Sequence, residues 1–108
     1  MNDLTEKGIL AGRNGNWEMA AALFESAAKE GDPEAVFELA ECYFYGEGKP
    51  QDYAKAASLY ERAYPDGDRR TYEKLAECFR MRRDGLQSET VAEQFEMEAE
   101  RIGREEQL

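Results

Sequence analysis

Apolar residues recur along the chain at intervals of three and four, the spacing that lines one face of an α-helix. The clearest helix is predicted after Asp32-Pro33, because an aspartate cap followed by proline favours a helix start. Its apolar positions are Val36, Leu39, Ala40 and Tyr43. Residues 46–50 contain glycine and proline and are expected to end this helix, and Asp52 is expected to cap a second one. The buried stripe of that second helix is predicted at Ala56, Leu59, Tyr60 and Ala63.

This helix–loop–helix unit recurs when the chain is shifted by 36 residues. Residues 39–43 (LAECY) then align with residues 75–79 (LAECF), and four of the five residues are identical. The same shift aligns columns of small residues at Ala20, Ala56 and Ala92 and at Gly31, Gly67 and Gly103. We therefore expect one all-α domain over residues 1–108, an α/α superhelical solenoid of three helix-turn-helix repeats at about 2–31, 32–67 and 68–108.

The two outer repeats are expected to differ from the middle one. Gly8 and Gly12 should interrupt the first helix and make it the least protected element, because glycine weakens a helix interior. In the third repeat, residues 82–85 stand where the middle repeat has its glycine turn. The last helix, at about 88–104, is heavily charged, as suits a terminal capping helix with one face in water.

The middle unit resembles a Sel1-like repeat (SLR), a subclass of the tetratricopeptide-like helical repeats. The resemblance rests on residues 35–48, which end in Gly46-Glu47-Gly48, and on a following set of residues: Asp52, Lys55, Ala56, Leu59, Tyr60, Ala63 and Gly67. The first repeat matches mainly in its second helix, and the third lacks the Gly-x-Gly turn. The resemblance implies an adaptor or scaffold rather than an enzyme.

Charge and composition narrow the classes of function. The chain has 24 Asp and Glu against 14 Lys and Arg, a net charge of −10, which argues against nucleic-acid binding. The basic stretch at 69–83 does not change this, because its last arginines complement the dipole of a predicted helix end. The chain has no histidine, the commonest general base and a frequent metal ligand. We predict that it is not an enzyme and holds no cofactor and no metal ion.

Cysteine usage and the N-terminal segment bear on the compartment. Cys42 and Cys78 occupy equivalent positions in adjacent first helices. Neighbouring helices lie about 8–10 Å apart, whereas a disulfide needs Cα atoms within about 7 Å, so we expect two buried thiols that act as small hydrophobes. The N-terminus lacks the pattern of a signal peptide, and no apolar run is long enough to cross a bilayer. We therefore expect a cytoplasmic protein without a membrane partner.

The candidate binding site follows from the resemblance. In tetratricopeptide-like stacks the first helix of each pair lines the concave groove, and the residues predicted to project there are Phe37, Glu38, Glu41, Phe44, Tyr45, Glu73, Glu77, Arg80 and Met81. Other aromatic residues are assigned to the core: Trp17, Phe24, Tyr43, Tyr60 and Phe79. Three consecutive aromatics at 43–45 cannot all face one core stripe, so at least one should be exposed. The alternative is that these charged positions form only a solvated face.

Two functions remain open at this stage. The first is an adaptor or chaperone-like module that anchors a peptide or protein segment through Phe37, Phe44 or Tyr45, with Glu41 and Glu77 forming an acidic step. The second is an acidic inhibitor or immunity-type protein that masks a basic surface of an enzyme or toxin. Salt separates them, because only the electrostatic inhibitor should lose association rate steeply with ionic strength. We expect a monomer or a weak homodimer.

Overall fold

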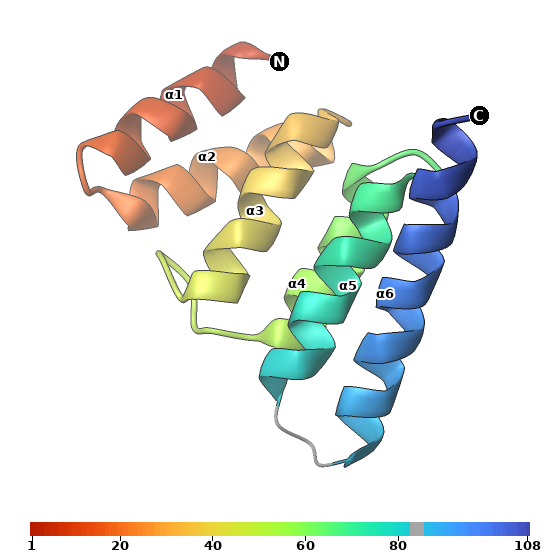
Figure 1. Ribbon diagram of the computed structural model, residues 1–108. Helices are drawn as coiled ribbons and strands as arrows, with labels where there is room; N and C mark the ends of the chain where they lie inside the picture. Colours follow the sequence, from red (N-terminus) through yellow and green to blue (C-terminus); the bar gives the residue numbers. More distant parts are fainter. Residues whose placement is uncertain (83–85) are drawn as a thin grey trace.

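The computed structural model describes residues 1–82 and 86–108, and within them all regular secondary structure is α-helical (Figure 1). The helices are α1 (Asp3–Arg13), α2 (Trp17–Lys29), α3 (Pro33–Tyr45), α4 (Tyr53–Ala63), α5 (Arg69–Arg82) and α6 (Leu86–Glu106). Each helix packs against the next one along the chain, so three helix pairs stack in a row with α1 and α6 at opposite ends. This confirms the predicted all-α repeat architecture. The turn predicted at 82–85 falls mostly on residues 83–85, which lie outside the described part of the chain.

Local sequence determines where the helices of the middle repeat begin and end. Asp32 Oδ1 accepts a hydrogen bond from the backbone N–H of Glu34 at 3.1 Å, and Asp52 Oδ1 accepts one from Lys55 at 3.0 Å. Gly46 ends α3 in the left-handed conformation, with φ of 70°, which glycine adopts without steric cost. Both predicted helix starts are therefore confirmed.

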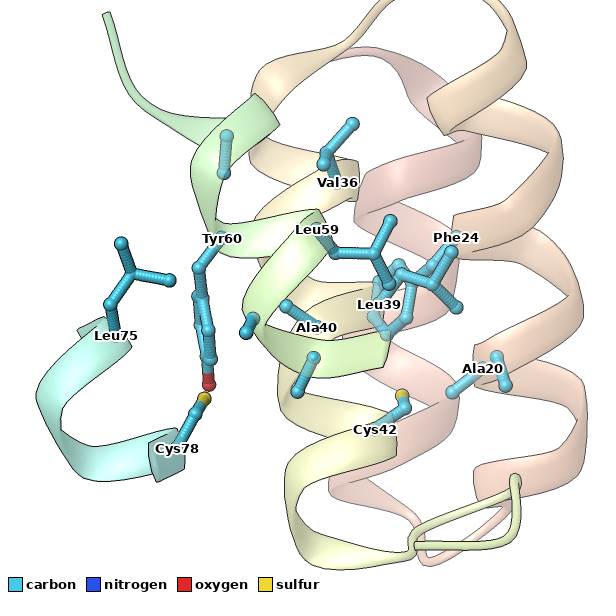
Figure 2. Close-up of a cluster of buried hydrophobic side chains, with 14 of the residues drawn as sticks. Ala20, Phe24, Val36, Leu39, Ala40, Cys42, Leu59, Tyr60, Leu75 and Cys78 are labelled. Atoms are coloured by element: carbon cyan, nitrogen blue, oxygen red, sulfur yellow. The ribbon is translucent and has the colours of Figure 1, made fainter. Parts of the chain in front are cut away.

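The core is built from small residues packed around a few large ones. The repeated alanines Ala20, Ala56 and Ala92 are fully buried, and the largest buried side chains include Phe24 and Tyr60. Figure 2 shows Cys78 beside the ring of Tyr60 within this cluster. Both cysteines are free and buried, and burial raises the pKa of each thiol to about 12. The expectation of two buried, unbridged thiols is confirmed.

Two expectations about the first repeat are wrong. Gly8 and Gly12 do not interrupt α1, which is continuous. Both glycines are buried because the rings of Phe24 and Trp17 pack directly against their Cα atoms. Trp17 itself was expected in the core but is 37% exposed, because it lies at the start of α2 and only part of its ring is covered by α1.

A polar junction ties the first repeat to the second. The Asp32 carboxylate, which caps α3, also accepts hydrogen bonds from the Thr5 hydroxyl at 2.6 Å and from the backbone N–H of Asn2 at 3.0 Å. Thr5 is fully buried. Burial alone would raise the pKa of Asp32, but the hydrogen bonds from Thr5 and the backbone outweigh it and lower this pKa. The junction fixes the N-terminal end of α1 against the start of α3.

Candidate functional site

The candidate site lies on α3 and α5, the first helices of the second and third pairs. Two of its predicted anchors are half-buried in an aromatic cluster. The ring of Phe37 lies 6.0 Å from that of Tyr60, and the ring of Phe44 lies 5.2 Å from that of Tyr53 and 6.5 Å from that of Tyr60. Phe37 and Phe44 therefore lie beneath the surface of this face, partly buried against the hydrophobic core.

Tyr45 and Met81 are the open apolar side chains of this face. Tyr45 is 58% exposed and Met81 is 41% exposed. Together with Phe44, Glu77 and Arg80 they line a pocket of about 280 Å³. Phe44 lies edge-on to Tyr45 with ring centres 4.9 Å apart, so the outer ring rests on the inner one. The structure thus brings five of the predicted residues into one small pocket between the ends of α3 and α5.

Lys74 lies in the middle of the face, between two carboxylates. Its Nζ lies 3.7 Å from a carboxylate oxygen of Glu41 and 3.8 Å from one of Glu77. Burial alone would lower the pKa of Lys74, but Glu41 and Glu77 outweigh this effect and raise it, so the ammonium is charged at neutral pH. Lys74 therefore lies between the two carboxylates of the expected acidic step and offsets part of their charge.

The remaining predicted residues lie beside the pocket. Glu38 is half-buried on α3, and burial together with Glu41 and Glu34 raises its pKa. Glu73 is exposed and pairs with Arg69 one helical turn earlier, at 3.0 Å. Arg80 lines the pocket but is held from its far side, since it forms ion pairs with Glu89 and Glu96 of α6. Arg80 thus contacts α6 as well as lining the pocket.

Two further properties of the described residues are relevant. No group of three or more Cys, Asp or Glu side chains in this part of the chain could hold a metal ion. Among the described helices, none is both long and apolar enough to cross a membrane. The charged residues that line the pocket are Glu77 and Arg80, and Lys74 lies next to Glu77. This arrangement can pair with a charged or polar group next to an apolar one.

A comparison with known protein families shows the family of this chain. A Sel1 repeat matches at residues 7–32 and again at 33–68, which together cover more than half of the chain. The chain belongs to the Sel1 repeat family. The matched Sel1 segments include most of α1 and all of α2, α3 and α4, and the pair α5–α6 extends the same helix-pair arrangement beyond them. Modules built from Sel1 repeats are generally protein–protein interaction modules and non-catalytic scaffolds.

A comparison with curated proteins gives a partial match. The Sel1 chain is 43% identical over 38 residues to an uncharacterized Sel1-like repeat-containing protein from Schizosaccharomyces pombe. The match covers 35% of this chain and 6% of that protein, so the Sel1 chain spans only a small part of its curated relative. No solved structure gives a significant match.

Proposed function

We propose that this chain is a non-catalytic adaptor that holds a peptide or protein segment on the face formed by α3 and α5. The observation that carries the proposal is the pocket in which exposed Tyr45 and Met81 lie next to Glu77 and Arg80. Large exposed apolar side chains are costly in water, and they mark interaction surfaces when they cluster. Membership of a family of interaction modules supports the same conclusion.

The pocket favours a segment with one apolar side chain beside a polar or charged group. Tyrosine offers a large, rigid contact area with a polar end, and methionine adapts its shape to different partners. The apolar side chain would rest between Tyr45 and Met81, above the ring of Phe44. Glu77 and Arg80 at the rim would then select the neighbouring group, because unpaired charges at the edge of a contact favour a complementary partner.

The test is affinity capture with the tagged protein from a lysate of the source cell, followed by mass spectrometry and titration calorimetry with the recovered partner. The test variant is Tyr45→Ala/Met81→Ala. The matched control is Met19→Ala/Met97→Ala, which removes two exposed apolar side chains elsewhere on the molecule. Loss of a central apolar anchor typically weakens binding about tenfold or more, so the pocket variant should lose the partner and the control should retain it.

Thermal denaturation checks that both variants fold. Partner binding that is equally strong in the pocket variant and the control would rule out this site.

The second candidate, an acidic protein that masks a basic surface, is favoured by α6, which carries seven acidic and two basic residues. It would show in the same titration as an affinity that falls steeply with salt and does not depend on Tyr45 or Met81.

A further inference from the structure

A second groove lies between α5 and α6. These two helices form the end of the row opposite α1 (Figure 1). The volume of the groove is about 800 Å³. We call it the end groove, and its charged lining residues are Arg69, Glu73, Glu77 and Arg80 of α5 and Glu96, Glu100 and Arg104 of α6. The site proposed above shares only Glu77 and Arg80 with it.

The preceding repeat shows how such a groove is filled, because α5 itself packs against α4 and the neighbouring side of α3. Lys74 of α5 lies 5.4 Å from the ring centre of Tyr60 and 5.8 Å from that of Phe37, besides its pairing with Glu41. One helical turn earlier, the Arg70 guanidinium lies 4.6 Å from the ring centre of Tyr64. The helix that fills this groove, α5, thus places two cations, Arg70 and Lys74 at positions i and i+4, against the groove.

The end groove is built from the counterparts of those same residues. A shift of 36 residues takes the four residues of the preceding repeat that contact Lys74 or Arg70 to residues of the end groove: Phe37 to Glu73, Glu41 to Glu77, Tyr60 to Glu96 and Tyr64 to Glu100. The groove therefore repeats the position of a surface that already holds a helix. Its composition has changed in one direction, since three aromatic side chains are replaced by glutamates.

Charge determines which helix could bind there. Four glutamates and three arginines, Arg69, Arg80 and Arg104, line the groove, and Arg69 is paired with Glu73 and Arg80 with Glu96. Glu77 and Glu100 are exposed between these pairs. Aromatic rings attract cations weakly when exposed, and carboxylates at the same positions attract them by direct charge. The change from rings to glutamates keeps the preference for cations while removing the apolar surface that would bind another repeat of the same kind.

We propose that the end groove receives an α-helix of another protein that carries Lys or Arg at positions i and i+4, docked as α5 docks on α3 and α4. This goes beyond the adaptor function, because it assigns a second surface with a different recognition chemistry. Tyr45 and Met81 belong to the first surface alone, and Glu96 and Glu100 belong to the second alone. The two proposals can therefore fail independently.

The test uses a peptide with the sequence of α5, residues 69–82 with Cys78→Ser, blocked at both ends and labelled for fluorescence anisotropy. This probe carries the natural i, i+4 pair Arg70 and Lys74. The full-length protein should bind it saturably at low salt. Glu100→Lys should weaken binding about fivefold or more, since it removes one favourable charge and adds an unfavourable one. The matched control is Glu98→Lys, which makes the same charge change on α6 outside the groove and should change binding less than about twofold.

Three results would overturn the proposal. The first is absence of saturable binding to the wild-type protein. The second is equal weakening by Glu100→Lys and Glu98→Lys, which would mean that only net charge matters. The third is equal binding of a scrambled peptide of the same composition, which would mean that the i, i+4 spacing of the cations is not recognised.

Sedimentation of the protein alone tests the occupant of the groove. A dimer that Glu100→Lys dissociates would assign the groove to a second copy of the chain and would also overturn the proposal. Tyr45→Ala/Met81→Ala should leave peptide binding unchanged.

Discussion

The size of single side chains determines how closely neighbouring helices of this protein can approach each other. Gly8 is the clearest case, because a Cβ atom at that position would lie 2.5 Å from Cε1 of Phe24. The ring of Phe24 is itself fully buried, so it cannot move aside without opening the core. The glycine is required by packing against α2 and has no role in breaking the helix.

We predict that Gly8→Ala destabilises the protein by about 1–3 kcal/mol, the usual cost of forcing an extra methyl group into a packed core. In an exposed helix the same change would stabilise by about 0.5–1 kcal/mol. Gly103→Ala is the matched control, since a Cβ there meets only the flexible Arg69 side chain, at 3.3 Å from Nη1. Urea denaturation measures both. A neutral or stabilising Gly8→Ala would mean that Phe24 does not pack on α1 as described.

The helices of the stack differ in how well they are packed. The first helix packs mainly on α2, and its outward side leaves Leu10 56% exposed. The junction of Thr5 and Asn2 with Asp32 attaches its N-terminal end to the next repeat. We therefore still expect α1 to be the least protected helix, and we attribute this to its position at the end of the stack and no longer to its glycines.

Amide exchange measured by mass spectrometry tests this expectation at the level of the element. Amides of α1 should exchange faster than those of α3, and Asp32→Ala should accelerate α1 further, by an amount that corresponds to about 1–2 kcal/mol for the lost hydrogen bonds. The control is Asp52→Ala, which removes the cap of α4 without touching α1. Equal protection of α1 and α3, or no response of α1 to Asp32→Ala, would contradict the prediction.

The whole molecule is a stack whose two ends differ in character. The end formed by α5 and α6 carries Glu73, Glu96 and Glu100 where the interior of the stack has Phe37, Tyr60 and Tyr64. Terminal repeats of a solenoid need a polar outer face, because an apolar end would bind further repeats or other copies. Glu73, Glu96 and Glu100 give the α5–α6 end of this stack such a polar face.

A variant that restores the interior residues at this end should behave differently from the wild-type protein. Glu73→Phe/Glu96→Tyr/Glu100→Tyr should self-associate, since it exposes an apolar surface of the kind that repeats bury against each other. Light scattering coupled to size-exclusion chromatography measures the mass. The control Glu73→Gln/Glu96→Gln/Glu100→Gln removes the same charges without adding apolar area and should keep the mass of the wild-type protein. If both variants associate equally, charge repulsion alone kept the end soluble.

The candidate site was predictable from the sequence where only spacing within one helix mattered. Exposure of Tyr45 follows from three aromatics in a row, since one helix face cannot bury all three. The role of Lys74 was not predictable, because its contacts with Glu41 depend on how α5 crosses α3. The exposure of Trp17 was not predicted for a similar reason. How far α1 covers its ring depends on the connection between α1 and α2, and this connection (residues 14–16) is shorter than the one between α3 and α4 (residues 46–52).

The helices and caps of the middle repeat, the repeat itself and the family could be read from the sequence, because they depend on residues within a few positions of each other or on a pattern that recurs along the chain. The packing of the helices decides which glycines lie under rings, which carboxylates share Lys74, and which counterparts of aromatic residues line the end groove. These features depend on contacts between different helices, and the angle and distance of such contacts are set by side-chain packing rather than by local spacing.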